Sequence, residues 1–355
     1  MLSVIIRIPL HPPSPARSMA ADSSGGPWLP ITSPRTLRAC SAFACRPSDA
    51  FVCSYPKSGT TWMQNVLAQV VTRLETLRPF AHVSDVSPFF EIDPHWEEAP
   101  PDDAPPRPSS SSSSSPPSSS LALSSKIREN HAAFGRRCFN THLPFSRMPR
   151  GARCVLVVRD GRDCAASFFH HLSSQAEEDG GWVQGWDAFF DAWIEGRIAF
   201  GSWFEHLEGW REGLERDAAR DAANDAAADA KNTTPRSRRL GPALVVRYQD
   251  ALRDLPSVVR RVAAHVSVDL TDAEVRAIAE KCGFAAMRSD LDRFQPISVR
   301  WTDPNFAFVR RGERGSHAEL FTPEQLRRFD AKAREVFGVD EATGAARVPF
   351  GAMDD

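Results

Sequence analysis

The sequence predicts an α/β domain in which a central, mainly parallel β-sheet is flanked by helices. Short apolar runs typical of strands alternate along the chain with segments of helical periodicity, and this alternation is typical of parallel sheets covered on both faces. The chain has 355 residues, 42% of them hydrophobic, which allows one large domain or two small ones. A polar, glycine-containing loop follows the first predicted strand, at the edge where such sheets bind ligands.

The predicted strands are short and apolar, and the predicted helices carry apolar residues on one face. Ala50 to Ser54 is the first strand candidate, and the spacing of Met63, Val66 and Leu67 predicts the helix after it. Further strands are expected at 137–141, 154–158 and 243–248. The expected helices are 62–77, about 162–172, about 186–213, 256–266, 272–282 and 323–337.

Composition predicts one domain at 41–345 with disordered segments around and within it. Residues 1–40 are rich in Ser, Pro and Arg with one acidic residue, so we expect a disordered tail, an organellar transit peptide, or a translation start at Met19. Disordered inserts are expected at about 98–125, which is Ser- and Pro-rich, and at 216–239, which is Ala- and Asp-rich. Residues 346–355 are expected to be a C-terminal tail. We expect a cytoplasmic protein, or an organellar one if the transit peptide is real.

Charge and cysteine content disfavour several classes of protein. The net charge is −2, so a nucleic-acid partner is not expected. No apolar run reaches the roughly 18 residues that a membrane span needs. The seven cysteines are scattered without a C-x-x-C pair, which predicts reduced thiols rather than zinc or a disulfide framework.

The stretch "YPKSGTTW" (55–62) predicts an anion-binding turn between a strand and a helix. Gly59 lets the backbone approach a ligand, and the helix start presents unpaired N–H groups. Further donors are the Lys57 ammonium and the hydroxyls of Ser58, Thr60 and Thr61. A phosphate is the favoured ligand, and an ordinary helix cap is the alternative. The loop is not a Walker A motif, because Lys57 precedes Gly59 and no glycine lies upstream in the loop.

Three other segments carry candidate site residues, each with a plain structural alternative. In "VVRDGRDCAASFFHH" (157–171), Arg159 and Ser167 suit a second phosphate, or the turn is only a helix cap. In "NTHLPFS" (140–146), His142 follows a strand and is either a functional group or a packed core residue. In "FVRRGERGSH" (308–317), basic residues surround glycines, as in a phosphate clamp or a solvated loop. His170 and His171 lack a third metal ligand and are read as surface or core residues.

Together these segments resemble the cytosolic sulfotransferases, which transfer a sulfuryl group from 3′-phosphoadenosine 5′-phosphosulfate (PAPS). The resemblance runs from about Phe43 to Phe337, interrupted by the two inserts, and its six segments keep the family's order. Besides those above, it includes "FDAWIEGRIAFGSWFEHLEGW" (190–210) and "VVRYQDALRDLP" (245–256). It implies the family's fold, similar to that of P-loop NTPases, and PAPS as co-substrate with no metal.

The resemblance also implies roles for individual residues. His142 would be the general base. The 5′-phosphosulfate would be held by Lys57, Ser58, Gly59, Thr60 and Thr61, with Lys57 also catalytic. The 3′-phosphate would be bound by Arg159, Ser167, Arg310, Arg311 and Gly312. The adenine would be contacted by Trp62, Tyr248 and Phe284. Sulfuryl transfer is an in-line displacement, so positioning and charge stabilisation should dominate.

The sequence departs from the family pattern at several positions. Asn140 stands where the family usually has a lysine, and Cys282 and Gly283 replace a hydroxyl pair near the adenine. The family's C-terminal dimer motif is absent around His317, so that dimer is not expected. We therefore keep three hypotheses: an active sulfotransferase, a PAP-binding pseudoenzyme, and a P-loop kinase or NTPase. The expected acceptor is a small apolar molecule with a hydroxyl or amine, in a pocket lined by Phe89, Phe90, Phe145 and Phe168.

Overall fold

A four-stranded parallel sheet forms the centre of the protein. The computed structural model describes residues 27–76, 78–98, 121–228, 241–303 and 306–353. The strands run in the order β4 (Cys138–Thr141), β1 (Ala50–Ser54), β5 (Arg153–Val158), β6 (Ala243–Arg247), all parallel. All four predicted strands are present, and the predicted fold class is confirmed. A separate antiparallel pair joins β2 (Trp96–Glu98) to β3 (Leu121–Leu123).

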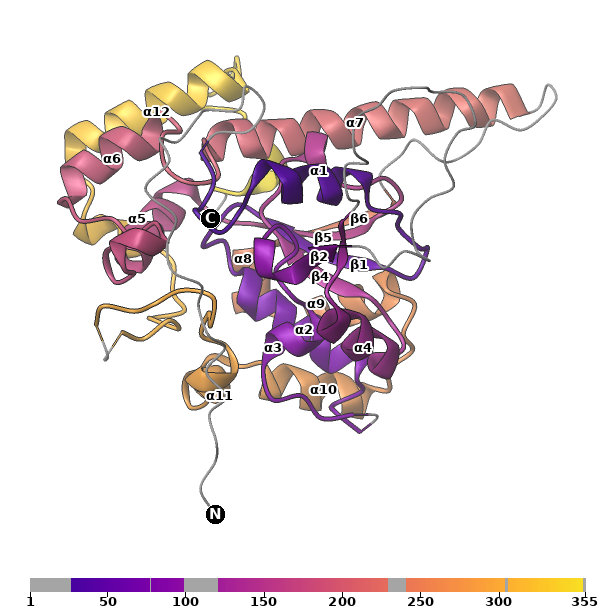
Figure 1. The fold of residues 1–355 in the computed structure, drawn as a ribbon. Helices are drawn as coiled ribbons and strands as arrows, with labels where there is room; N and C mark the ends of the chain where they lie inside the picture. The colour runs from indigo at the N-terminus through magenta and orange to yellow at the C-terminus, as the bar shows by residue number, and fades with distance from the viewer. Residues whose placement is uncertain (1–26, 77, 99–120, 229–240, 304–305, 354–355) are drawn as a thin grey trace, which may run out of the picture.

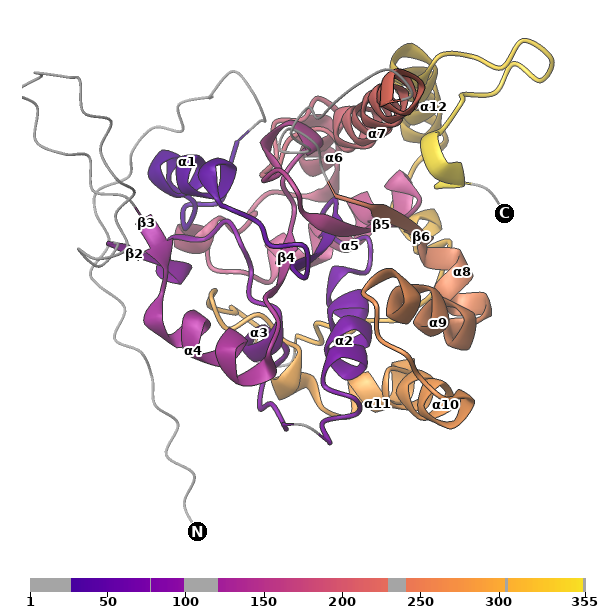
Figure 2. The same cartoon turned by 90° about the vertical axis from the view of Figure 1, so that its right-hand side faces the viewer.

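Helices cover both faces of this sheet (Figures 1 and 2). Phe51 and Cys53 in β1 point to one core, and Ala50 and Val52 point to the other, as the two-residue period of a strand requires. The first core is completed by α1 (Pro34–Ala42), α5 (Gly161–Ser173), α6 (Trp186–Ile194), α7 (Trp203–Ala228) and α12 (Pro323–Phe337). The second is completed by α2 (Thr60–Val71), α9 (Leu255–His265) and α10 (Asp272–Lys281).

Four further helices lie among the described residues, and all but the second of them carry residues of the cavity described below. They are α3 (Val83–Val86), α4 (Ser125–Phe134), α8 (Tyr248–Arg253) and α11 (Phe284–Arg288). The carboxyl ends of β4, β1 and β5 meet at one edge of the sheet, where the β1–α2 loop, His142 and Arg159 follow directly. The sheet thus brings three of the predicted functional segments together.

Two predicted helices differ from those observed. The helix expected at 62–77 ends at Val71, because Arg73, Leu74 and Glu75 adopt left-handed backbone conformations. The Glu75 carboxylate holds this turn by accepting from Lys281 Nζ at 2.6 Å and Arg293 Nη2 at 2.7 Å. The helix expected at 186–213 is two helices, α6 and α7. Between them the backbone reverses through positive φ angles at Gly196, Phe200 and Gly201.

The predicted disordered segments are partly wrong. Within 1–40, residues 27–40 are ordered, and Leu37 and Cys40 of α1 are buried. Within the predicted insert at 98–125, residues 121–125 form β3 and the start of α4. Within 216–239, helix α7 continues to Ala228. The predicted tail at 346–355 packs on the domain, with Ala352 buried and Gln249 Nε2 donating to Gly351 O at 2.9 Å. Residues 1–26, 99–120, 229–240 and 354–355 lie outside the described residues.

Helix α7 approaches the segment after His142 so closely that one position requires glycine. A Cβ at Gly213 would overlap the ring of Phe145, whereas a Cβ at Gly209 on the same helix would meet nothing. We predict that Gly213→Ala destabilises the protein by about 1–3 kcal/mol through overpacking. Gly209→Ala, the matched control, should stabilise it by about 0.5–1 kcal/mol through helix propensity. Denaturant unfolding measures both changes, and equal effects of the two substitutions would contradict this packing.

Candidate active site

The β1–α2 loop is shaped as an anion cradle by two residues with positive φ. Lys57 has φ 66° and Gly59 has φ 103°, so the loop turns sharply before α2 begins at Thr60. A Cβ at Gly59 would lie 2.9 Å from Tyr248 Cδ2, which is why glycine is needed there. The Thr60 hydroxyl lies 2.6 Å from Ser54 Oγ, which ties the start of the helix to the end of the strand. The predicted strand–turn–helix arrangement is therefore present.

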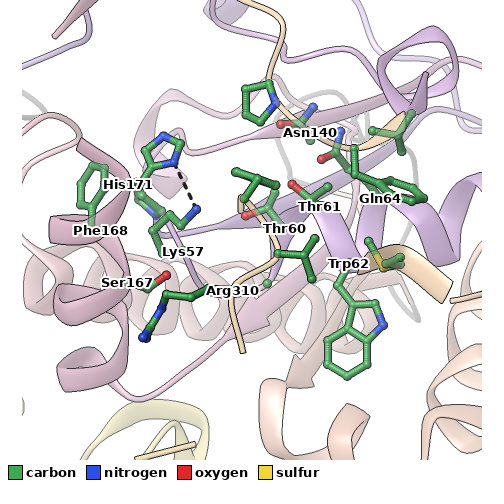
Figure 3. Close-up of a pocket in the computed structure, with 18 of the residues that line it drawn as sticks. Lys57, Thr60, Thr61, Trp62, Gln64, Asn140, Ser167, Phe168, His171 and Arg310 are labelled. Carbon is green, nitrogen blue, oxygen red and sulfur yellow. Dashed lines mark hydrogen bonds between the residues drawn. The ribbon is translucent and has the colours of Figure 1, made fainter. Parts of the chain in front are cut away.

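Nearly all of the predicted site residues open onto a single cavity of about 500 Å³. Those on its wall are Lys57, Gly59, Thr60, Thr61, Trp62, His142, Arg159, Ser167, Tyr248, Phe284, Arg310, Arg311 and Gly312. Figure 3 shows several of them approaching the cavity from different elements. Ser58 is the exception, because its side chain is buried behind the loop with Oγ 3.4 Å from Cys164 Sγ. The hydroxyl of Ser58 therefore does not contribute to the cavity wall.

Three basic side chains, Lys57, Arg159 and Arg310, form a cationic cluster at the centre of this wall. Burial, reinforced by the charges of Arg159 and Arg310, lowers the pKa of Lys57 to about 7. The Arg159 guanidinium donates from Nη1 to Lys57 O at 3.1 Å and from Nη2 to Glu313 O at 2.9 Å. Among the described residues, Arg310 forms no ion pair. The positive charges of the cluster therefore outnumber the negative charges of the acidic side chains beside it, which favours an anionic ligand.

Asp163 holds the C-terminal basic loop against α5. Its carboxylate accepts from Gly315 N at 3.0 Å, from His317 N at 3.2 Å and from His317 Nδ1 at 2.9 Å. Burial alone would raise the pKa of Asp163, but the hydrogen bond from His317 and the charge of Arg159 outweigh it and lower the pKa to about 2. The loop that carries Arg310 is thereby fixed beside Arg159.

The two predicted arginines of that loop differ in their surroundings. Arg310 lines the cavity next to the cationic cluster. The Arg311 guanidinium instead pairs with Glu319 and its side chain is 43% exposed. Only Arg310 is thus free to bind an anion through its side chain, and the contribution of Arg311 is limited to its part of the wall.

The far end of the cavity is a slot between aromatic rings. Trp62 is fixed by a hydrogen bond from Nε1 to Cys282 O at 2.8 Å, and the Tyr248 ring meets it edge-on at 5.4 Å between centroids. A Cβ at Gly312 would overlap the ring of Phe284, so the loop backbone lies directly on that ring. Phe284 itself is 39% exposed at the cavity rim. A flat aromatic base fits this combination of ring faces and backbone.

His142 is held in a defined tautomer at the end of β4. Its Nδ1 lies 2.8 Å from Ser54 O, so Nδ1 carries the proton and Nε2 keeps a free lone pair. Burial and the positive charge of Lys57 lower the pKa of His142 to about 4, despite the hydrogen bond to Ser54. At neutral pH the ring is therefore uncharged and able to accept a proton.

The wall around His142 includes residues that composition did not predict. Leu29 and Ile31, from the segment expected to be disordered, line the cavity. Phe200 N donates to Pro27 O at 2.7 Å, which holds this N-terminal segment in place. A local sequence pattern cannot predict this contact, because Pro27 and Phe200 lie far apart in the chain. Of the expected aromatic lining, Phe89 and Phe168 face the cavity, whereas the predictions for Phe90 and Phe145 are wrong because both are packed in the core.

Two further polar residues near His142 differ from expectation. Asn140 lines the cavity, and its Nδ2 donates to Ser87 O at 2.9 Å, so no cation replaces the lysine that the family usually has there. His171 lies in the cavity wall with Nδ1 3.4 Å from Lys57 Nζ (Figure 3), so its interpretation as an inert surface or core residue is wrong. The sequence does contain a signal for this position: His171 lies four residues after Ser167, and residues four apart on a helix lie on the same face.

Glu91 is a buried carboxyl group behind His142. Its Oε1 accepts the backbone N–H of His142 at 2.6 Å, and the residue has no exposed surface. Burial raises the pKa of Glu91 to about 8, although hydrogen bonds from His142 and Thr141 oppose the shift. Glu91 is thus a neutral acid at pH 7 that positions the backbone of the candidate base.

We predict that Glu91→Gln changes the pH dependence of stability. The folded protein keeps a proton on Glu91 up to about pH 8, whereas the unfolded chain loses it near pH 4.5. Stability from this group is complete below pH 4.5 and is lost as the pH rises to about 8. Relative to Glu91→Gln, the wild-type free energy of unfolding should fall by up to about 4 kcal/mol between pH 5 and pH 8.

Denaturant unfolding at the two pH values measures this difference. Glu178→Gln, at a surface carboxyl that is 68% exposed, is the control and should follow the wild type at both pH values. Parallel profiles for the wild type and Glu91→Gln would contradict the assignment of Glu91 as a neutral buried acid.

Within the described ranges no cluster of three or more His, Cys, Asp or Glu side chains is arranged to hold a metal ion. The same ranges contain no helix that is both long and apolar enough to cross a bilayer.

Comparison with solved structures gives the same fold. Mouse sulfotransferase SULT7A1 complexed with PAP aligns with a TM-score of 0.58 at 23% identity, covering 88% of this chain and 92% of that one. Retinol dehydratase in a complex with retinol and PAP aligns with a TM-score of 0.58 at 18% identity, covering 87% of each chain. At identities this low, the structural similarity supports the fold alone.

Comparison with curated sequences identifies the family. Sulfotransferase 1C2 of Oryctolagus cuniculus is 25% identical over 308 residues, which are 83% of this chain and 84% of that protein. Sulfotransferase 1A1 of Rattus norvegicus is 23% identical over 300 residues, which are 81% and 84% of the two chains. The profile of the sulfotransferase domain matches residues 47–220 and 228–339. The chain therefore belongs to the sulfotransferase family.

Proposed function

We propose that this protein transfers the sulfuryl group of PAPS to a hydroxyl or amine of a small acceptor, with His142 as general base. One observation carries the proposal: the cradle around Lys57 and the group formed by Arg159, Ser167 and Arg310 open onto the same cavity as His142. A nucleotide with phosphates at both its 3′ and 5′ positions needs two such anion sites. Two structural neighbours are complexes with PAP, the desulfated product.

The site residues divide between the two ends of the nucleotide. The ammonium of Lys57, the hydroxyls of Thr60 and Thr61 and the N–H groups at the start of α2 would hold the 5′-phosphosulfate. Arg159, Ser167 and Arg310 would hold the 3′-phosphate, joined by the backbone of Gly312. The adenine would lie in the slot formed by Trp62, Tyr248 and Phe284. Ser58 would act through its backbone alone, since its hydroxyl faces Cys164.

The chemistry requires a base on one side of the sulfur and a cation on the other. His142 Nε2 would accept the proton of the acceptor hydroxyl as its oxygen attacks the sulfur. The bond between sulfur and the 5′-phosphate oxygen would break in the same displacement, and PAP would leave with the bonding electron pair. Lys57 would stabilise the charge that grows on that leaving oxygen.

A PAP-binding protein without turnover is the second candidate, and Asn140 is the observation that favours it. The amide is bound to Ser87 O and offers no positive charge to the sulfuryl group. The nucleotide site itself is unaffected by this replacement. No separate observation favours a kinase or NTPase.

Assay of the purified protein with labelled PAPS and a panel of phenols, alcohols and amines tests the proposed activity. We expect transfer to at least one acceptor, and we expect His142→Ala to lower kcat by roughly 10²- to 10⁴-fold, as is typical for loss of a general base. PAP affinity, measured by calorimetry, should change little. PAP binding without transfer to any acceptor would favour the second candidate, and full activity of His142→Ala would remove it as the base.

PAP binding should be coupled to proton uptake by Lys57. The free protein has Lys57 about half protonated near pH 7, because its pKa is lowered to about 7. The charge of a bound phosphate offsets the burial and the repulsion that lower this pKa, so at pH 8 binding should take up close to one proton, and affinity should fall as the pH rises above 7. Calorimetry at pH 8 in buffers of different ionisation enthalpy measures this uptake. Lys57→Arg, which stays charged, should show none; equal uptake by both proteins would contradict the assignment.

A further inference from the structure

The end of α5 presents two polar side chains to the acceptor side of the cavity that the proposed chemistry does not use. They are His171, in the last turn of the helix, and Gln175, two residues beyond it. Gln175 N donates to Leu172 O at 3.2 Å, so the chain is still turning as in the helix when it reaches Gln175. Both side chains line the cavity that contains His142.

The imidazole of His171 offers a donor to the cavity. Its Nδ1 faces the Lys57 ammonium at 3.4 Å, and a cation that donates to Nδ1 leaves the ring proton on Nε2. Burial, with the positive charge of Lys57, keeps the pKa of His171 well below its ordinary value, so the ring is neutral. The rings of Trp301 and Phe308 pack around it at 5.1 and 5.8 Å. Among the described residues, Nε2 has no hydrogen-bond partner.

Gln175 offers an acceptor. The residue is only 4% exposed, and its Nε2 donates to Asp179 O, which fixes the orientation of the amide. The described part of the chain supplies no partner for Oε1. An acceptor in the wall of a largely apolar cavity is costly to leave without a hydrogen bond. One group that accepts from His171 and donates to Gln175 would satisfy both side chains.

We propose that this pair binds a second hydroxyl of the acceptor, so that the protein acts on molecules with two hydroxyl groups. The inference rests on the proposed sulfuryl transfer, because it places the reacting hydroxyl at His142 and the second one at His171 and Gln175. A hydroxyl can donate and accept from the same atom, as this pair requires. A carboxylate has no proton for Gln175 Oε1, and an ammonium has no lone pair for His171 Nε2. The acceptor site is therefore selective for diols, not generally apolar.

Matched pairs of aromatic acceptors test the proposal. The probes are 2-naphthol against 2,6- and 2,7-dihydroxynaphthalene, and 4-phenylphenol against 4,4′-dihydroxybiphenyl. For at least one pair, the wild type should show kcat/KM about 10-fold or more higher for the diol, beyond the factor of two that two equivalent hydroxyls supply. His171→Phe and Gln175→Met should each bring that ratio to about two. His170→Phe, the neighbouring histidine that does not line the cavity, should keep it.

Binding of the same probes to the complex with PAP provides a readout that does not need turnover. Calorimetry should show about 10-fold tighter binding of the favoured diol to the wild type and to His170→Phe, and equal binding of diol and phenol to His171→Phe. This pattern without any transfer would overturn the proposed activity and support the diol site. Transfer without a preference for any diol, or a preference that survives in both His171→Phe and Gln175→Met, would overturn the diol site and leave the activity standing.

Discussion

The burial of Lys57 beside Arg159 and Arg310 is the constraint on which the rest of the site depends. Three like charges in a partly dry cavity repel one another, and the pKa of Lys57 is lowered to about 7 first by burial and then by the charges of Arg159 and Arg310. Such an arrangement is unfavourable in the free protein, and only the surrounding fold keeps it together. A multiply charged anion in contact with all three groups would relieve this repulsion, so the arrangement favours such a ligand.

Arg159 is the structural link between the segments of this cluster. Its guanidinium donates to the backbone at Lys57 and at Glu313, and it lies 4.3 Å from the centroid of the Tyr248 ring. Asp163, four residues later, accepts from the backbone N–H of Gly315 at 3.0 Å. Segments more than 250 residues apart in sequence, at 57 and 313, are thus joined through the start of one helix. The C-terminal loop is therefore tied to the turn after β5 by Arg159 and to the first turn of α5 by Asp163.

The sequence predicted the sheet and the strand–turn–helix loop at Lys57 because both follow from local patterns. Apolar runs mark buried strands, and a lysine with glycine and hydroxyls at a strand end marks an anion site. The predictions of disorder, which were made from amino-acid composition, are wrong for residues 27–40 and 216–228. Residues 216–228 are rich in alanine, which favours a helix without any apolar anchor. In 27–40, a few residues such as Leu37 and Cys40 are enough to fix the segment once the domain offers them a groove.

The acceptor wall was the least predictable part, since it is assembled from segments that share no local signal. Leu29, Phe89 and Phe200 meet around His142 only in the folded chain. Their apolar character agrees with the expectation of an apolar pocket. The few polar atoms in such a wall therefore have a large effect on which ligands bind. In a low-dielectric wall each unpaired donor or acceptor discriminates strongly between ligands, because a ligand that fails to satisfy it leaves the full desolvation cost.

Two neutral polar side chains, Asn140 and His171, lie in the cavity wall that also contains His142. Asn140 removes a cation on one side, and His171 adds a neutral donor on the side of Lys57. Because burial and the positive charge of Lys57 already lower the pKa of His142, a second cation at position 140 would lower it further and weaken the candidate base. A neutral amide at 140 and a neutral imidazole at 171 keep polar contacts in the wall without that effect. Among the described residues, Lys57 is the cation whose charge acts on His142.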